Sequence, residues 1–560
     1  MAATCSICME LRASFTTDNT NMTHTTSLSS VSSLPYAATG FYNDIVLDYI
    51  SGDEKLRPFY QHAVSWAGLE AAMNARELAP VNRKVLVEAL EQQYKAAGLN
   101  GEAAVDEAIQ LLAEPTTYTV CTAHQPNIFT GYLYFIYKIL HAIRLAESLR
   151  ERYPEASFVP VFYMGSEDAD LDELGKINLG GEKLVWNTNQ KGAVGRMQTK
   201  GLEPLLHRIE GQLSVLPYGP QLMQLLRTAY LESRDIQTAT FRLVHELFKQ
   251  YGLVVLIADQ PDLKRIMQPV FEDDLFNQTA SAIVMETVKR LSASYKVQAN
   301  PRSINLFYLK DDIRNRIERT ENGFVVVDTG IEFTEEEMKS ELEQFPERFS
   351  PNVILRGLYQ ETILPNIAFI GGGGELAYWL ELKELFQHYK VPYPVLVLRN
   401  SFLLVPENLA AKIDRMGFSL ADFFQPTDEL MNQLVKRDSS VQVHLSSELR
   451  DSQAFYQHLQ NLAGKIDTTL VPHVQALEKQ MLHRLKELEK KMLRAEKRKF
   501  SDQSRQLEAI RNILFPNNSL QERVENFLPY YAQHGPAFID KIYTESPALE
   551  QAFRIVKCEL

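Results

Sequence analysis

The chain contains the stretch Thr122-Ala-His-Gln-Pro-Asn-Ile-Phe-Thr-Gly131, which follows the apolar, β-branched run Tyr118-Thr-Val-Cys121 and precedes an amphipathic segment that ends near Arg152. This order predicts a strand, a polar turn and a helix. In an open α/β sheet such a turn lies at the carboxyl end of a strand, where ligands bind, and free N–H groups at a helix N-terminus attract anions. We therefore predict a ligand-binding turn. Its candidate substrate-binding residues are His124, Gln125, Asn127, Gly131 and, in the helix, Lys138.

From residue 116 onward, strand patterns alternate with helical patterns, which is typical of a doubly wound α/β sheet. Several of the strand patterns are near-continuous apolar runs, as expected for parallel strands that are buried on both faces. The expected strands are 118–123, 158–165, 253–258, 304–309, 324–328 and 394–398. The mostly helical stretch near 195–250 and the mixed stretch near 265–365 are longer than a normal crossover. We interpret both as insertions into a Rossmann-like core.

The rest of the chain divides by composition. The first forty residues are rich in Ser, Thr and Asn and lack a periodic apolar pattern, so we expect them to be disordered, and Met22 is an alternative start. The expected segments are a disordered tail (1–40), a helical segment (41–115), the Rossmann-like core (116–445), a coiled coil (446–515) and a C-terminal segment that packs back on the core (516–560).

The coiled coil is predicted from apolar residues that step by four and three, as in an a/d seam. These residues are Met481, Leu485, Leu488, Met492 and Ala495. The pattern fits either an antiparallel hairpin or one strand of a dimer. Lys and Arg residues fill the positions between them, so this stretch is basic within an acidic protein. A solvated helical face explains the basic run, and a docking surface for an acidic partner is the alternative.

Composition limits the class of protein. The chain has 560 residues, 45% of them hydrophobic, and a formal net charge of −13, which disfavours a general nucleic-acid binder. We find no run of 18 or more apolar residues, so we expect no membrane span. Cys5 and Cys8 form a C-x-x-C without the further ligands that zinc needs, so we predict no metal site. The four cysteines are typical of a reducing, cytoplasmic compartment.

A second polar turn, Gly165-Ser-Glu-Asp-Ala-Asp170, follows the expected strand 158–165. Like charges disfavour one another, so clustered acids need a cation, a metal or a hydrogen-bonding substrate. Capping of the next helix is the alternative explanation. The two turns follow strands of the same predicted sheet and are expected to face one crevice. The candidate catalytic residues are Glu167, Asp168 and Asp170, with Ser166 as a candidate for substrate binding.

The third constellation is Gly371-Gly-Gly-Gly-Glu-Leu-Ala-Tyr378. Glycines allow a ligand to approach the backbone closely, although a flexible connection is equally compatible with them. The stretch is neither a P-loop nor a dinucleotide fingerprint. Glu375 and Tyr378 lie on one face of the helix that is expected to follow. Arg302 and Arg399, which are near strand ends, are candidate partners for carboxylate or phosphate groups, and a structural ion pair is the alternative for each.

Taken in order, these motifs resemble one family, BshC, the cysteine-adding enzymes of bacillithiol biosynthesis. The resemblance covers roughly residues 41–560. The motifs that carry it are His124 to Lys138, Val159 to Asp170, Ser350 to Arg356, Glu361 to Pro365, Gly373 to Tyr378, Phe515-Pro-Asn, and Leu520-Gln-Glu-Arg523. The chain departs from the pattern at His124, where the family commonly has Gln, and near Ala169, where the family has a His.

The resemblance implies a Rossmann-like core with two connecting-peptide insertions and a C-terminal coiled coil that mediates dimerisation. It implies the last step of bacillithiol synthesis, in which the carboxyl group of L-cysteine is joined to the amine of glucosaminyl malate. The core is also similar to the class I aminoacyl-tRNA synthetase fold, whose His-rich turn binds ATP phosphates, so ATP is the expected cofactor. The second His, the closing Gly-His pair and the Lys-Met-Ser-Lys-Ser loop of those synthetases are absent here.

These expectations combine into one hypothesis. The first turn binds the anionic part of the substrate, the acidic turn holds an ammonium group or a metal or acts as a base, and the activated carboxyl group is an adenylate or an acyl phosphate. Two other functions stay open: a nucleotidyl- or glycosyl-transferase on the same sheet, and a dimeric scaffold that holds pathway enzymes through its coiled coil. We expect a homodimer with small-molecule substrates, without nucleic acid or membrane partners.

Overall fold

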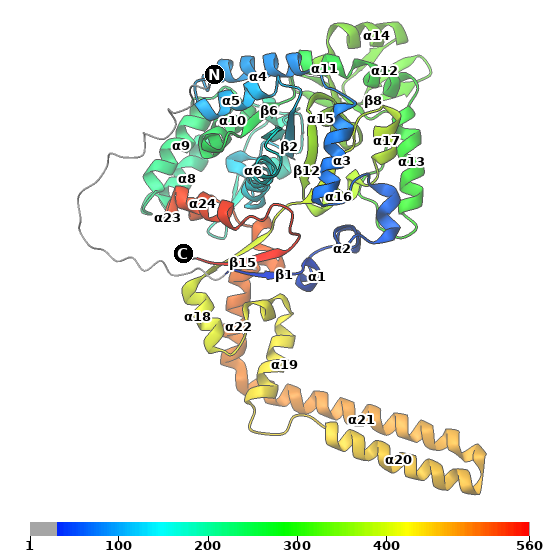
Figure 1. The fold of residues 1–560 in the computed structure, drawn as a ribbon. Helices are drawn as coiled ribbons and strands as arrows, with labels where there is room; N and C mark the ends of the chain where they lie inside the picture. The colour runs from blue at the N-terminus through cyan, green and yellow to red at the C-terminus, as the bar shows by residue number, and fades with distance from the viewer. Residues whose placement is uncertain (1–30, 559–560) are drawn as a thin grey trace, which may run out of the picture.

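The computed structural model describes residues 31–558, and its centre is a five-stranded parallel sheet in the order β13-β12-β2-β3-β6 (Figure 1). The strands are β2 (Thr117–His124), β3 (Ser157–Met164), β6 (Val254–Ile257), β12 (Asn366–Gly371) and β13 (Val395–Leu398). Nearly every residue in them is buried, which explains why the runs are apolar throughout. The predicted Rossmann-like fold class is therefore confirmed. Strand β12 was missing from the expected strands.

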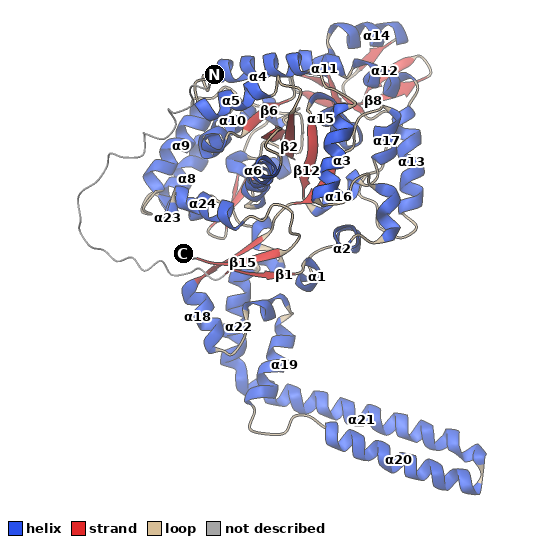
Figure 2. Cartoon of the chain, in the orientation of Figure 1, coloured by secondary structure: helices blue, strands red, loops and turns tan. Residues whose placement is uncertain are grey.

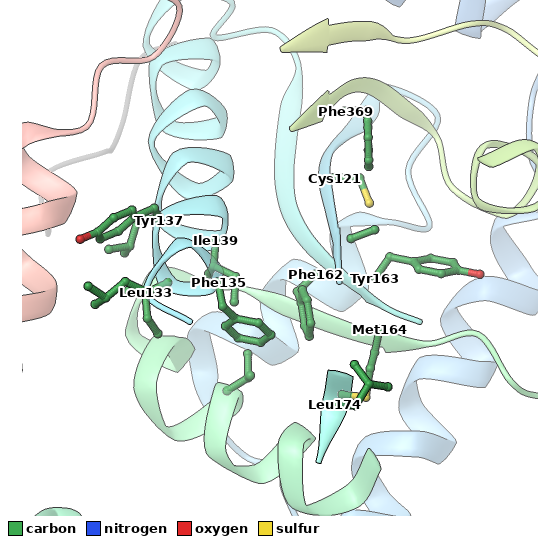
Figure 3. Close-up of a cluster of buried hydrophobic side chains, with 14 of the residues drawn as sticks. Cys121, Leu133, Phe135, Tyr137, Ile139, Phe162, Tyr163, Met164, Leu174 and Phe369 are labelled. Carbon is green, nitrogen blue, oxygen red and sulfur yellow. The ribbon is translucent and has the colours of Figure 1, made fainter. Parts of the chain in front are cut away.

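Helices cover both faces of this sheet (Figure 2). Phe162 of β3 meets Phe135 of α6 (Tyr134–Arg152) edge to face, with ring centroids 5.1 Å apart. The next residue, Tyr163, points to the other face and meets Tyr359 of α15 (Val353–Ile363). Figure 3 shows Phe135, Phe162 and Tyr163 in this buried cluster. The core thus fixes both the strands and the helix that follows the first turn.

The first described residues are ordered, contrary to the prediction of a disordered tail up to residue 40. Val31–Leu34 form β1 and Tyr36–Thr39 form α1. Strand β1 pairs antiparallel with β15 (Phe553–Cys558), which pairs parallel with β14 (Phe402–Pro406). This three-stranded sheet joins the first and the last strand of the described residues, an interaction that local composition does not reveal. Residues 1–30, including Cys5, Cys8 and Met22, lie outside the described residues.

The segment 41–115 is helical, and the two insertions differ from each other. The N-terminal helices are α2 (Asp44–Ser51), α3 (Trp66–Glu77), α4 (Arg83–Ala97) and α5 (Ala103–Leu111). The first insertion holds α8 (Glu203–Leu213), α9 (Gly219–Leu231) and α10 (Ile236–Phe248). The second holds α11 (Pro261–Ile266), α12 (Gln268–Phe276), α13 (Thr279–Leu291), α14 (Glu335–Gln344) and an antiparallel sheet.

That antiparallel sheet has the order β10-β9-β8-β7-β11. Its strands are β7 (Leu306–Lys310), β8 (Ile313–Thr320), β9 (Gly323–Val326), β10 (Ile331–Phe333) and β11 (Phe349–Pro351). The expected strands 304–309 and 324–328 therefore belong to this second sheet and not to the parallel one. A short hairpin of β4 (Lys176–Leu179) and β5 (Glu182–Val185) follows α7 (Leu171–Leu174). The helices α16 (Gly373–Trp379) and α17 (Lys383–His388) lie between β12 and β13 in the chain.

A long helical hairpin projects from the body of the molecule (Figure 1). It consists of α20 (Ser446–Ile466) and α21 (Val471–Lys497), and the bond from Gln460 to Glu478 shows their antiparallel register. Of the two arrangements that the seam allowed, the chain therefore forms a hairpin on itself. Its base consists of α18 (Glu407–Arg415), α19 (Thr427–Asp438) and α22 (Ser501–Leu514). Helices α23 (Leu528–His534) and α24 (Pro536–Glu545) return to the body, where Tyr543 donates a hydrogen bond to Glu147 of α6.

Within residues 31–558 we find no helix with the length and apolar character needed to cross a membrane.

Candidate functional site

The carboxyl ends of the parallel strands meet at a cavity of about 570 Å³. Strands β3 and β6 lie to one side of β2, and β12 and β13 lie to the other, so the strand order reverses next to β2. A crevice at such a switch point is where open α/β sheets bind ligands. Another cavity, of about 610 Å³, lies at the amino end of β3 near Ser157 and contains none of the predicted site residues.

Eight of the predicted residues line the cavity at the switch point, together with the glycines 372–374. They are His124, Gln125, Glu167, Asp168, Arg302, Glu375, Tyr378 and Arg399. The expectation that both polar turns face one crevice is thus met by the geometry, and Gly372, Gly373 and Gly374 line the same crevice.

Asn127 and Gly131, which we predicted to bind substrate, are instead buried and do not line the cavity. Asn526 of the C-terminal segment donates hydrogen bonds to the carbonyl oxygens of Phe129 and Gly131, at 2.9 and 2.5 Å. Gly131 has φ of 68°, and a Cβ atom there would lie 2.9 Å from the Cβ of Asn127. The turn therefore needs these residues for its own conformation.

The roles predicted for Ser166 and Asp170 are also wrong, because neither residue lines the cavity. Ser166 is buried beneath Gly195, where an added Cβ would lie 2.4 Å from the Ser166 carbonyl oxygen. Asp170 is exposed, does not line the cavity, and accepts a hydrogen bond from the Glu173 N–H at 3.1 Å as the N-cap of α7. For Asp170 the alternative explanation, capping of the next helix, is the one that the structure supports.

Lys138 lies behind the cavity wall and is almost fully buried. Its Nζ donates to the Ala123 carbonyl oxygen at 2.6 Å and to Oε2 of Glu375 at 2.5 Å. Burial lowers the pKa of Lys138, although the neighbouring Glu375 opposes that shift. Glu375 also accepts from the Gly372 N–H at 2.8 Å. Lys138 therefore joins α6 to the glycine run and positions Glu375, so direct substrate binding by Lys138 is not supported.

Asp168 is the carboxylate that the cavity exposes most clearly. Its side chain is 38% exposed, and its Oδ2 accepts a hydrogen bond from Nε2 of Gln125 at 3.0 Å. Arg314 of β8 approaches Oδ1 at 3.4 Å, donates to Oγ of Ser350 at 3.1 Å, and lies over the ring of Phe307. The two polar turns are thus connected directly. Sequence reasoning missed Arg314 because it lies near the start of an insertion strand, β8, without a local signal.

Glu167 is held from the interior by a buried cluster of charges. Lys264 of α11 contacts Glu167 and donates to the Phe349 carbonyl oxygen at 2.9 Å. Asp259 lies 3.5 Å from Lys264 and accepts two hydrogen bonds from Arg196, both at 2.7 Å. Burial raises the pKa of Glu167, with Lys264 opposing the shift. Asp259 was predictable, because it follows the expected strand 253–258 at its carboxyl end.

Arg399 and the neighbouring Arg356 are largely committed to protein partners. Arg399 donates to Glu522 at 2.6 Å and to the Asn400 carbonyl oxygen at 3.1 Å. Arg356 donates to the Tyr378 hydroxyl at 2.5 Å. Both guanidinium groups are thus bonded to other side chains of the protein, Arg399 to Glu522 and Arg356 to Tyr378. The predicted anion-binding role of Arg399 therefore loses its support.

His124 is a neutral imidazole at the edge of the cavity. Burial, together with the cations Lys138, Arg399 and Arg356, lowers its pKa well below the ordinary value. Its Nε2 is buried and has no hydrogen-bond partner within the described part of the chain. The ring instead packs near Tyr134, with centroids 5.3 Å apart.

The cavity thus combines a protein-held carboxylate, a second carboxylate with a raised pKa, and an open glycine backbone. Carboxylates in this setting hold ammonium groups or accept protons. In residues 31–558 no group of three or more His, Cys, Asp or Glu side chains is arranged to hold a metal ion.

Comparison with known proteins places nearly the whole chain, residues 30–558, in one group. Two family models match: "Bacillithiol biosynthesis BshC, N-terminal Rossmann-like domain" over residues 30–400 and "Bacillithiol biosynthesis BshC, C-terminal coiled-coil domain" over 402–558. The second match begins at β14, whereas we predicted that the core extends to residue 445. The stretch 402–445 contributes β14 and the base of the hairpin, so it belongs with the C-terminal domain.

Curated relatives agree over nearly their full length. "Putative cysteine ligase BshC" of Flavobacterium johnsoniae is 38% identical, covering 93% of this chain and 99% of the relative. The proteins of the same name from Christiangramia forsetii and Salinibacter ruber are 37% and 30% identical, covering 93% and 91% of this chain and 98% and 95% of the relatives. A solved structure described as an arginyl-tRNA synthetase of Campylobacter jejuni has 11% identity, covers 80% of this chain and 99% of its own, and has a TM-score of 0.22, too low to support an argument. The chain therefore belongs to the BshC family of bacillithiol biosynthesis.

Proposed function

We propose that this enzyme joins the carboxyl group of L-cysteine to the amine of glucosaminyl malate and so completes bacillithiol. Family membership makes the chain a ligase. The observation that carries the finer assignment is the cavity at the sheet switch point, where Asp168 is held by Gln125 and Arg314 beside the second carboxylate, Glu167. We place the reaction in the cytoplasm, in keeping with the cysteine usage.

Amide formation requires the attacking amine to lose its proton and the acyl group to be activated. We assign the proton-accepting role to Asp168, because its side chain is exposed to the cavity while Gln125 and Arg314 fix its orientation. Glu167 lies next to it, and its raised pKa suits a group that changes protonation state during turnover. The neutral His124 lines the same cavity and packs near Tyr134.

ATP fits the residues that are present. Gly372, Gly373 and Gly374 line the cavity, and an added Cβ on Gly374 would meet nothing within 4 Å, so the backbone there is open to a ligand. The cavity volume also lies in the range of small-molecule sites, about 300–1,000 Å³. When bound, ATP would supply activation of the cysteine carboxyl group. The glycine backbone would hold it, and Glu375, fixed by Lys138, would keep that backbone in place.

We also propose that the protein is a homodimer that associates through the hairpin. Helix α20 has no buried residue, and α21 has only Glu496. Large apolar side chains remain exposed along the hairpin: Phe455, Leu462, Ile466, Leu477, Met481 and Leu488. An apolar seam that the hairpin leaves uncovered is typical of an association surface.

Purified protein tests the ligase assignment when it is supplied with L-cysteine, glucosaminyl malate and labelled ATP. We expect bacillithiol to form and the labelled nucleotide product to identify the activation chemistry. Asp168→Asn should lower kcat/KM about a hundredfold or more, because general base catalysis contributes on that scale.

Asp170→Asn is the matched control, since Asn also caps helices and residue 170 lies outside the cavity. It should remain close to the wild type. Equal activity in the two variants, or transfer of a nucleotidyl or glycosyl group in place of ligation, would refute the assignment.

A further inference from the structure

A short segment of the C-terminal domain is built into the core. This segment is η10 (Gln521–Arg523), a single turn in the Leu520-Gln-Glu-Arg523 motif. Glu522 is fully buried and accepts hydrogen bonds from Arg399 at 2.6 Å and from the Ser401 hydroxyl at 3.1 Å. Gln521 accepts from the Leu404 N–H at 3.0 Å. The turn is therefore held both by Arg399 of the core and by β14 of its own domain.

The fixed turn brings Arg523 to the cavity. Arg523 lines it, and its side chain is exposed. Its backbone N–H donates to the Leu520 carbonyl oxygen at 2.9 Å, while no ion pair or hydrogen bond of its guanidinium occurs within residues 31–558. Because Glu522 already satisfies Arg399, the free cation at this side of the cavity is Arg523 and not the predicted Arg399.

Arg302 reaches the same cavity from the second insertion. Its N–H donates to Oδ1 of Asn305 at 3.2 Å, and its carbonyl oxygen accepts from Nδ2 of Asn305 at 3.1 Å. Asn305 is itself bonded to the buried Asp274. These hydrogen bonds hold the backbone at Arg302, while the Arg302 side chain is exposed and has no partner in the described part of the chain.

The other arginines that line the cavity are all bonded to protein groups. Arg314 binds Asp168 and Ser350, Arg356 binds Tyr378, and Arg399 binds Glu522. Arg302 and Arg523 therefore offer the guanidinium donors that remain available to a ligand. A guanidinium fork matches a carboxylate in shape and charge. Two such forks, which come from separate segments of the chain, can each bind one carboxylate.

We propose that Arg302 and Arg523 together bind the two carboxylates of a dicarboxylate substrate group. This inference rests on the proposed function, because the malate part of the proposed acceptor is such a group. It gives the C-terminal domain a role in substrate selection in addition to association. Arg523 is thus a specificity-determining residue that is supplied from outside the Rossmann-like core.

Calorimetric titration of the full chain with L-malate tests this without relying on turnover. Arg302→Gln and Arg523→Gln should each weaken L-malate binding about tenfold, the loss expected for one charge-assisted interaction. Acetate should bind the wild type far more weakly than L-malate. Arg498→Gln is the matched control: it removes an exposed arginine of the same domain that does not line the cavity. It should bind L-malate as the wild type does.

Wild-type affinity for L-malate in both cavity variants, or no binding by the wild type at millimolar concentrations, would overturn the proposal. Loss of inorganic phosphate binding with unchanged L-malate binding would assign the arginines to phosphate and would also overturn it. Arginine-dependent L-malate binding without ligation would refute the proposed function but retain this subsite. Ligation with an unchanged KM for glucosaminyl malate in both variants would refute the subsite alone.

Discussion

The cavity and the helical hairpin use charged residues in opposite ways. Behind the cavity wall, Lys138 and Lys264 are buried, and each is paired with an acid. In the hairpin, pairs such as Lys490 with Glu487 are exposed. Exposed pairs contribute about 0–1 kcal/mol, whereas buried charges carry a large desolvation penalty.

This difference in the burial of charged residues distinguishes the region proposed for catalysis from the region proposed for association. Stability alone does not favour the buried charges at the switch point, so their presence there indicates a functional site. The basic residues of the hairpin are solvated and need no ligand, which supports the simpler of the two explanations for that run. The feature of the hairpin that calls for a partner is its exposed apolar seam.

Removing one member of a buried pair should be far more damaging than removing one member of an exposed pair. Arg399→Met leaves Glu522 buried without its cation, at the joint between the two domains. We expect a loss of about 3–5 kcal/mol in the free energy of unfolding, measured by urea denaturation. Arg505→Met, which breaks the exposed pair with Asp502, should change it by less than about 1 kcal/mol. Similar losses in the two variants would remove the contrast.

Acid should weaken the same joint through His141. Its Nδ1 accepts from the Asn400 N–H at 3.1 Å, its Nε2 lies 2.9 Å from the Ala548 carbonyl oxygen, and burial lowers its pKa from 6.5 to about 4. Below pH 6.5 the unfolded chain therefore binds more protons than the folded chain. Stability should fall as the pH decreases from 6.5 towards 4, with about 3 kcal/mol from this group.

Unfolding curves for the wild type and His141→Gln across that range measure the contribution as the difference in slope. Replacing the exposed His483 of the hairpin with Gln is the matched control. A slope that is the same in the wild type and His141→Gln would contradict the assignment of the buried, neutral imidazole.

Substitutions in the exposed apolar seam of the hairpin should alter the association of two chains with little effect on the free energy of unfolding. Leu488→Glu places a charge on the exposed seam, where the side chain is 48% exposed. We expect a shift from dimer to monomer in analytical ultracentrifugation, while the unfolding of the body changes by no more than about 0.5 kcal/mol. Lys490→Glu, which changes a solvated charge, should leave the oligomeric state unchanged. A monomeric wild type would refute the dimer proposal.

The fold and the site could be predicted from the sequence where a local pattern determines the structure. The apolar runs at 118–123 and 158–165 became central strands, and the polar turns after them meet because parallel strands end at one edge. They could not be predicted where contacts with distant segments of the chain determine the local structure. Asn526 fixes the Gly131 turn, and β15 orders the segment near Val31. Arg314 and Arg523 reach the cavity from an insertion and from the C-terminal domain. No motif contains Arg314, and the motif Leu520-Gln-Glu-Arg523 does not by itself show that Arg523 lies at the site.

The most direct test of the account compares the two regions in one assay. Bacillithiol is measured in a strain that lacks its own enzyme and expresses either Asp168→Asn or Leu488→Glu, with protein levels matched by immunoblot. Asp168→Asn should reduce bacillithiol to a small fraction of the wild-type level, whereas Leu488→Glu should retain it. Normal bacillithiol with Asp168→Asn and none with Leu488→Glu would contradict the account and identify the protein as a scaffold.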